Sequence, residues 1–180
     1  MSRLPAIDKD ALSDEQKRMH DDIMRVRGQV RGPFEIWLNS PVLGSLALQT
    51  QDWFQKKSSL PARLVELAIL VMARKASAQF AWAVHEKRGL ENGLTQDVVD
   101  AIRTRTTPVF ARDDERMVHD IACELSETQT LSPLSYQRAV AFFGVTTLVE
   151  LVSLAGFYVM VAMVLNTFEA DTPSGRKMLD

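Results

Sequence analysis

Residues 60–93 read LPARLVELAILVMARKASAQFAWAVHEKRGLENG, and this stretch decides the fold. It predicts two helices with a short break near residues 75–77. Glu66 stands inside the first helix among apolar neighbours (Leu64, Val65, Leu67, Ile69, Leu70 and Val71). A carboxylate in such surroundings loses its hydration, so it needs a hydrogen-bonding or charged partner, or it takes up a proton. His85, on the second helix, is the predicted partner.

The second helix places four residues on one face, at positions i, i+3, i+4 and i+7: Ala78, Ala81, Trp82 and His85. Ser77 is the expected N-cap of this helix. Two small side chains beside an imidazole leave space, which favours a pocket at this face. Small residues also allow two helices to approach closely, so packing is the alternative interpretation.

Several segments before this stretch are expected to be helical. Ser13 and Gln16 form a capping-box pattern, and Gly28 is expected to end the helix that this pattern begins. The two signals predict a peripheral helix over residues 14–27. Ser40 with Pro41 starts another helix, which continues to about residue 57. A loop between the two helices carries Phe34 and Trp37. These aromatic residues either anchor the loop to the core or wall a pocket.

Helices are also expected after this stretch. Residues 96–103 follow Thr95 as N-cap, and residues 113–127 form an amphipathic helix that carries His119 and Cys123 one turn apart. This spacing is compatible with a metal, but two ligands without a third favour ordinary packing. Ser132 and Pro133 start a helix that ends at Gly144, and a long apolar helix follows.

The apolar helix, residues 145–165, is long enough to cross a membrane, but we favour a core helix or one beneath a subunit interface. Its only charged residue is Glu150, for which Arg63 or Arg74 is the expected partner. Residues 169–180 are expected to form a frayed tail. No strand pattern occurs, so the 180 residues are predicted to form one all-α domain.

The composition narrows the partners and the compartment. The formal net charge of -2 argues against nucleic acid as a partner. Cys123 is the only cysteine, which removes a disulfide framework, a redox CxxC motif and a multi-cysteine zinc site. The N-terminus has no apolar segment of the kind found in signal peptides. We therefore expect a cytoplasmic protein whose partner is neither nucleic acid nor a membrane.

Glu66, His85 within QFAWAVH, and the following Gly89–Gly93 with Leu94 and Thr95 together resemble the carboxymuconolactone decarboxylase family. Outer segments are similar as well: Gly32–Phe34, Trp37–Pro41 and Tyr158–Asn166. The resemblance covers roughly residues 30–168. It implies an all-helical bundle of the alkylhydroperoxidase D-like type. It also implies homotrimers or homohexamers with the site near subunit contacts.

Two departures from the family pattern concern the site. Ala78 and Ala81 stand where peroxidase members carry their CxxC, so dithiol reduction of peroxides is not available through that pair. Decarboxylase-like members often carry a second carboxylate at the position of Ala81.

The resemblance implies a cofactor-independent, metal-free decarboxylase that acts on a small carboxylated lactone or a related ring-cleavage product. His85 would donate a proton or anchor a carboxylate, and Glu66 would orient it. Arg31 beside Phe34, or else Arg63 or Arg74, would bind the substrate carboxylate. The expected substrate-binding residues are Arg31, Phe34, Trp37, Ala78, Ala81, Trp82 and Tyr158.

Three alternatives remain open from the sequence. Glu66 and His85 can form a purely structural contact between two helices. A thiol-dependent hydroperoxide reductase would use Cys123 instead. The third alternative is a protein of the same fold that binds small molecules or supports assembly without catalysis.

Overall fold

The computed structural model describes residues 2–5 and 7–180. In these residues all regular structure is helical and no strand occurs, which confirms the all-α prediction. A 3-10 turn spans Lys9–Ala11. It is followed by α1 (Asp14–Arg27), α2 (Pro33–Trp37), α3 (Pro41–Lys56), α4 (Ala62–Lys75), α5 (Gln79–Glu91), α6 (Gln96–Thr104), α7 (Asp113–Thr128) and α8 (Pro133–Thr167).

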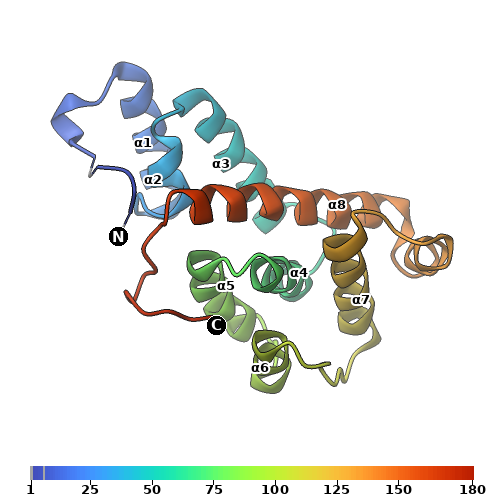
Figure 1. Ribbon diagram of the computed structural model, residues 1–180. Coiled ribbons are helices and arrows are strands. Elements are labelled where there is room, and N and C mark those ends of the chain that lie inside the picture. Colours follow the sequence, from blue (N-terminus) through green and yellow to red (C-terminus); the bar gives the residue numbers. More distant parts are fainter. Residues whose placement is uncertain (1, 6) are drawn as a thin grey trace.

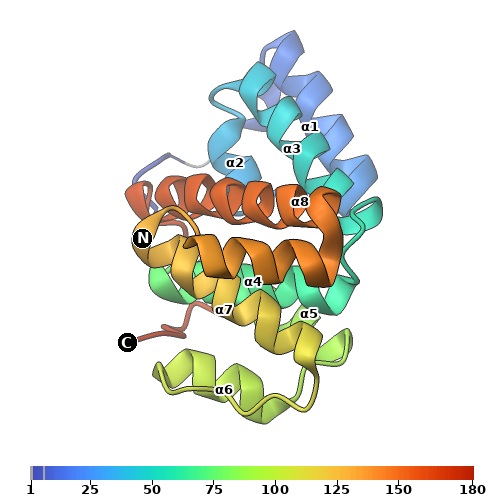
Figure 2. The ribbon, with the colours of Figure 1, turned by 90° about the vertical axis from the view of Figure 1, so that its right-hand side faces the viewer.

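Helix α4 is the centre of the bundle. It packs against α5, α7 and α8, which surround it in Figure 1. Every residue from Arg63 to Arg74 is buried, which agrees with a helix that is apolar on all sides. Figure 2 shows α6 at the edge of the molecule that is farthest from α1 and α3.

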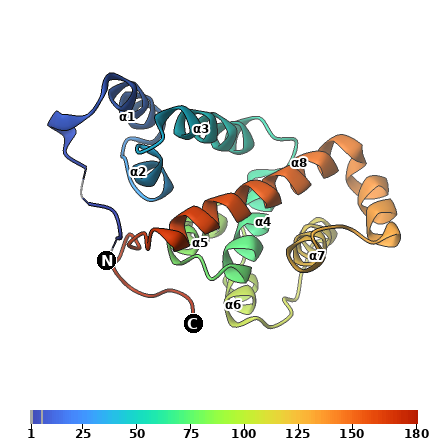
Figure 3. The same ribbon diagram turned by 45° about the horizontal axis from the view of Figure 1, so that its top comes forward.

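Helices α1, α2 and α3 form a second layer. They lie on one side of α8, whereas α4 to α7 lie on the other side (Figure 3). The capping box of Ser13 and Gln16 is present at the start of α1, and Gly28 ends that helix with a left-handed φ of 71°. Both predicted ends of this helix are therefore confirmed.

Two predictions about local structure are wrong. The segment with Phe34 and Trp37, predicted to be a loop, is the short helix α2, in which both aromatic side chains are buried. Ser77, the expected N-cap of α5, has a φ of 49° and lies before the cap residue, Ala78. The turn closes through a backbone hydrogen bond of 2.8 Å from Ala78 N to Ala73 O.

Helix α8 has two parts, because Gly144 within it has a φ of 79° and a ψ of 165°. The predicted break at this glycine is confirmed. Among the described residues, α8 alone is long and apolar enough to cross a membrane by length and composition. Half of its most apolar window is buried inside the protein.

Glu150 does not bind an arginine, which corrects the sequence-based expectation. Its Oε2 accepts hydrogen bonds from Ser58 Oγ at 2.8 Å and from the backbone N of Ser59 at 2.7 Å. Arg63 instead pairs with Asp114, at 2.7 Å, and with Glu115 (both at the start of α7). Arg74 donates its Nε to the carbonyl oxygen of Arg103 at 2.6 Å.

The end of the C-terminal tail, expected to be frayed, contacts α5. Gln79 Oε1 accepts hydrogen bonds from the backbone N atoms of Met178 and Leu179, and Gln79 Nε2 donates to Leu179 O. Leu179 is itself buried in the core. The last residues of the chain therefore lie against the start of α5.

Candidate functional site

Glu66 and His85 form the predicted pair. Oε2 of Glu66 lies 2.6 Å from Nδ1 of His85, and both side chains are almost completely buried. The other carboxylate oxygen, Oε1, accepts a hydrogen bond of 3.2 Å from Nε2 of Gln55. The carboxylate thus replaces its lost hydration with two side-chain partners, one from α5 and one from α3.

Tyr158, on α8, contacts the other ring nitrogen of His85. Its phenol oxygen lies 3.2 Å from Nε2, and the same oxygen accepts a hydrogen bond of 3.1 Å from Nε2 of Gln51. Because Gln51 supplies a proton to this oxygen, the phenol hydrogen is free to point at His85. Nδ1–H of His85 can thus donate to Glu66, while Nε2 can accept from Tyr158 or, when it carries a hydrogen, donate to the phenol oxygen.

The phenol of Tyr158 stays protonated in this environment. Burial raises the pKa of Tyr158 above its ordinary value, and the negative charge of Glu66 raises it further. The hydrogen bond from Gln51 acts in the opposite direction but is outweighed. Tyr158 is therefore a hydrogen-bond donor across the physiological pH range.

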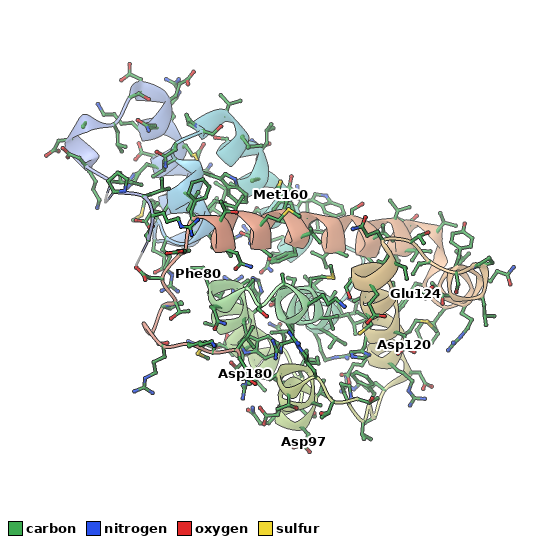
Figure 4. All side chains as sticks on the ribbon, in the orientation of Figure 1. Phe80, Asp97, Asp120, Glu124, Met160 and Asp180 are labelled. Carbon is green, nitrogen blue, oxygen red and sulfur yellow. The ribbon has the colours of Figure 1, made fainter. Side chains whose placement is uncertain are left out.

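A pocket opens beside His85. It encloses about 570 Å³, including its open mouth. Four expected site residues line it, namely Arg31, Phe34, Ala81 and His85. The other lining residues are Arg27, Gln29, Pro33, Gln51, Phe80, Val84, Arg88, Val161 and Leu165. Phe80 is labelled in Figure 4, where it lies on α5 beneath the C-terminal end of α8.

The pocket is strongly cationic. Arg27, Arg31 and Arg88 line it, and none of the described lining residues is an aspartate or a glutamate. Arg88 donates through Nη1 to Oε1 of Gln55 at 3.3 Å, so it is linked through that amide to Glu66. Guanidinium groups are the side chains best suited to bind a carboxylate or another small anion.

Arg27 is the most unusual of these cations. It donates Nη2 to Oε1 of Gln51, and its guanidinium lies 5.4 Å from the ring centre of Phe34. Its buried Nε has no hydrogen-bond partner among the described residues. Burial lowers the pKa of Arg27, and the positive charge of Arg88 lowers it further. An anion bound in the pocket would oppose the effect of Arg88.

The other expected site residues lie outside the pocket lining. Trp82 is fully buried and donates Nε1 to Oε2 of Glu86 at 3.0 Å. Ala78 is buried at the start of α5, and Trp37 packs against Phe34 with ring centres 5.6 Å apart. Tyr158 reaches the site only through His85 and Gln51.

Sequence reasoning missed four polar residues of the site, namely Arg27, Gln51, Gln55 and Arg88. Gln51 and Gln55 stand one turn apart on α3, and this spacing was a signal that both face the same neighbour. Arg88 follows His85 by three residues and so shares its face of α5. Arg27 gave no such signal, because the last residue of a polar helix is normally solvated.

Cys123 and His119 lie apart from this site. The Cys123 sulfur is 3.5 Å from Nε2 of His119, and no third His, Cys, Asp or Glu completes a metal-binding group within the described part of the chain. Burial raises the pKa of the Cys123 thiol to about 11, with Glu127 and Asp120 adding to the effect. The thiol is therefore almost wholly protonated at neutral pH, and the thiolate is the reactive form.

The site is thus a buried Glu–His pair beside a pocket lined by arginines, within an all-helical bundle. In a comparison with known proteins, residues 46–115 match the model of the carboxymuconolactone decarboxylase family. The predicted resemblance is thus confirmed, and the matched segment contains both Glu66 and His85.

The fold is also that of a solved structure, an uncharacterized peroxidase-related protein from Silicibacter sp. TM1040. The TM-score is 0.75 at 14% sequence identity, and the similarity covers 93% of this chain and 88% of that chain. At this identity the similarity concerns the fold alone. No curated protein matches the sequence.

Proposed function

We propose that this protein is a cofactor-independent lyase that releases carbon dioxide from a small carboxylated lactone or a related ring-cleavage product. The observation that carries the proposal is the position of His85. It is held by Glu66 at 2.6 Å and lines a pocket that also contains three arginines. A proton-transfer group thus faces a site suited to carboxylates.

Binding of the substrate would use the arginines. Arg27 and Arg88 approach the pocket from α1 and α5, and each repels the other in the absence of an anion. A carboxylate placed between them would accept hydrogen bonds from both guanidinium groups. Arg31 lies at the same pocket and is the expected second contact.

The chemical step needs an electron acceptor within the substrate. The bond between the ring carbon and the departing carboxylate breaks, carbon dioxide leaves, and the electron pair moves into the conjugated lactone carbonyl to give a dienolate. A proton then adds to carbon and restores the lactone. The substrate gains one proton for each carbon dioxide released, and the protonated form of His85 is its proposed source.

Glu66 and Tyr158 would position His85 for this transfer. The carboxylate of Glu66 fixes Nδ1 and compensates the positive charge of a protonated ring. Tyr158 sits at Nε2, the nitrogen from which a proton would leave, and its own high pKa keeps it neutral. The arrangement resembles other sites in which a carboxylate orients a histidine.

Two alternatives compete with the lyase. A hydroperoxide reductase would require Cys123 as nucleophile, and the high pKa of its thiol weighs against this reading. A binding or assembly protein would retain the pocket without turnover. Product formation distinguishes a lyase from a binding protein. Dependence on the Cys123 thiol distinguishes a reductase from a lyase.

The decisive experiment measures carbon dioxide release from a panel of carboxylated lactones and β-keto acids. We expect turnover by the unmodified chain and a loss of roughly 10²-fold or more in His85→Ala, the usual size of a general acid contribution. His20→Ala, on α1 outside the site, is the matched control and should retain activity. Ligand-induced thermal stabilisation with no product from any compound would favour the binding protein instead.

A further inference from the structure

We propose that the outer face of α8 is an interface with a second copy of this chain, in which the two α8 helices pack antiparallel and cross at Gly156. We call this face the α8 stripe. It consists of Val145, Val149, Val152, Gly156, Val159 and Met163.

The α8 stripe has the spacing of a helix-pairing seam. Its members follow one another by four, three, four, three and four residues, which is the 3.5-residue period of paired helices. The four valines are 38% to 58% exposed and Met163 is 65% exposed. The opposite face of the same helix is buried in the bundle. Helix α8 is thus apolar on two faces. The inner face packs in the bundle, whereas the outer face is uncovered in the described residues of a single chain.

No charge interrupts this surface. Glu150 is the only charged residue between positions 145 and 163, and it turns away to Ser58 and Ser59. Helices that lie on a membrane surface usually carry lysine or arginine beside their apolar face, and residues 145–165 contain neither. An apolar protein surface is therefore the better-matched occupant.

Gly156 points to a close approach by another helix. A Cβ atom at this position would meet no atom of the chain within 4 Å, so the fold of one chain does not require glycine here. Glycine is among the weakest helix formers, and its presence in a helix interior calls for another reason. A second backbone that passes close to Gly156 supplies that reason.

The residues around Gly156 make the surface self-complementary. In an antiparallel pair that crosses at this residue, position 149 of one chain faces position 163 of the other. Val149 lines an apolar groove of about 1060 Å³, including its open mouth, together with Leu131, Tyr136, Val145 and Val152. Met163 is a flexible, exposed side chain suited to fill such a groove. The contact would occur twice, as two-fold symmetry requires.

The size of the surface shows how far the contact must extend. Eighteen residues of helix span about 27 Å, and a helix is about 10 Å wide, so the stripe alone covers about 270 Å². A stable dimer buries about 800 Å² on each partner. The groove, to which Tyr136 on the first part of α8 contributes, is therefore included in the proposed interface.

This contact bears on the site, because the inner face of α8 carries Tyr158, Val161 and Leu165. Pairing would brace the wall of the pocket. It would also produce an even number of chains, so of the trimer and hexamer implied by the resemblance it is compatible with the hexamer.

The first test measures the molar mass of the full chain by light scattering or sedimentation. We expect the unmodified chain to associate and Val149→Glu to shift the mass to that of a smaller species. Val109→Glu is the matched control, because Val109 is 91% exposed in a loop away from α8. Circular dichroism checks that each variant is folded. The proposal is overturned if the unmodified chain is monomeric, or if Val149→Glu associates as well as Val109→Glu.

The second test concerns the antiparallel direction. Val149→Glu and Met163→Lys should each weaken association, and a mixture of the two variants should recover it. In the mixed pair, one crossing has Glu opposite Lys while the other retains the original valine and methionine. Parallel helices would place like residues opposite each other, and the mixture would not recover. Binding of the monomeric chain to anionic lipid vesicles, lost in Val149→Glu, would favour a membrane and overturn the proposal.

Discussion

The phenol oxygen of Tyr158 lies 3.2 Å from Nε2 of His85, on the side of the ring opposite Glu66. The imidazole is thus held at both nitrogens by residues from two other helices, α4 and α8. A histidine restrained in this way has one tautomer and one orientation. The imidazole therefore has a fixed orientation before any ligand binds.

Replacing Tyr158 with phenylalanine tests the role of this contact. Tyr158→Phe removes the hydroxyl that contacts Nε2 of His85, and it leaves the side-chain amide of Gln51 without its acceptor. We therefore expect a loss of about 1–2 kcal/mol in unfolding free energy. If the lyase proposal is correct, kcat should fall more than KM changes. Urea denaturation and steady-state kinetics measure the two effects. Tyr136→Phe is the control, since Tyr136 is half exposed. Equal behaviour of the two variants would contradict a positioning role for Tyr158.

Changing Glu66 to glutamine should destabilise the fold. Both carboxylate oxygens of Glu66 accept hydrogen bonds, from His85 and from Gln55, whereas an amide offers only one acceptor. One buried donor would then face another donor, at a cost of about 1–3 kcal/mol. Urea denaturation checks the expectation against Glu91→Gln, a surface change on α5. A drop in stability with unchanged turnover would assign the pair a structural role alone.

Arg27→Met separates binding from stability. We expect KM for a carboxylated substrate to rise about tenfold to a hundredfold, because a charged hydrogen-bond donor is lost from the pocket. Stability should change little, because loss of the hydrogen bond to Gln51 is offset by removal of a partly buried charge that lies next to Arg88 and has an unpaired Nε. Arg25→Met on the same helix is the control, because Arg25 is largely exposed. A large loss of stability with unchanged KM would contradict an anion-binding role.

Thiol labelling tests the reductase alternative. With a pKa of about 11, about one Cys123 thiol in 10⁴ is ionised at pH 7. We expect slow alkylation at neutral pH, with a rate that rises about tenfold per pH unit until the pH approaches 11. The chain unfolded in urea is the control and should react at the rate of an ordinary cysteine. Rapid labelling of the folded protein at pH 7 would restore Cys123 as a candidate nucleophile.

Glu150 makes stability depend on acid pH. Burial raises the pKa of this carboxyl, but hydrogen bonds from the backbone and hydroxyl of Ser59 and from Ser58 outweigh it, so the pKa is lowered overall. A lowered pKa means that the ionised form stabilises the fold above the ordinary carboxyl pKa. This contribution is lost as the pH falls through the lower pKa of the folded protein. Urea denaturation from pH 7 to acid should show a shallower pH dependence in Glu150→Gln than in the unmodified chain.

The central pair could be predicted because its physics is local. A carboxylate within an apolar helix needs a partner, and His85 was the histidine on the next helix. The same reasoning failed for Glu150, since its partners are serine hydroxyls and a backbone N–H in the loop before α4. Sequence does not show which loop a helix will pass, so an arginine was expected instead.

The cationic lining of the pocket could be predicted only in part. Arg31 was expected beside Phe34, and both line the pocket. Arg27 and Arg88 were missed, because a charged residue at a helix end or after a histidine normally faces solvent. Their partial burial depends on α1, α3 and α5 meeting at one place, which is a tertiary property. The helix boundaries, by contrast, followed from caps and glycines such as Gly28 and Gly144.

Gly32 and Phe80 together control the size of the pocket. A Cβ atom at position 32 would lie 2.3 Å from the ring of Phe80, and Gly32 has a φ of 63°, which other residues rarely adopt. Any side chain here would force the ring to move, and Phe80 lines both the pocket beside His85 and a second hollow that also contains Gly32. A single methyl group at position 32 would therefore reshape the wall between these two spaces, without altering any residue proposed to touch the substrate.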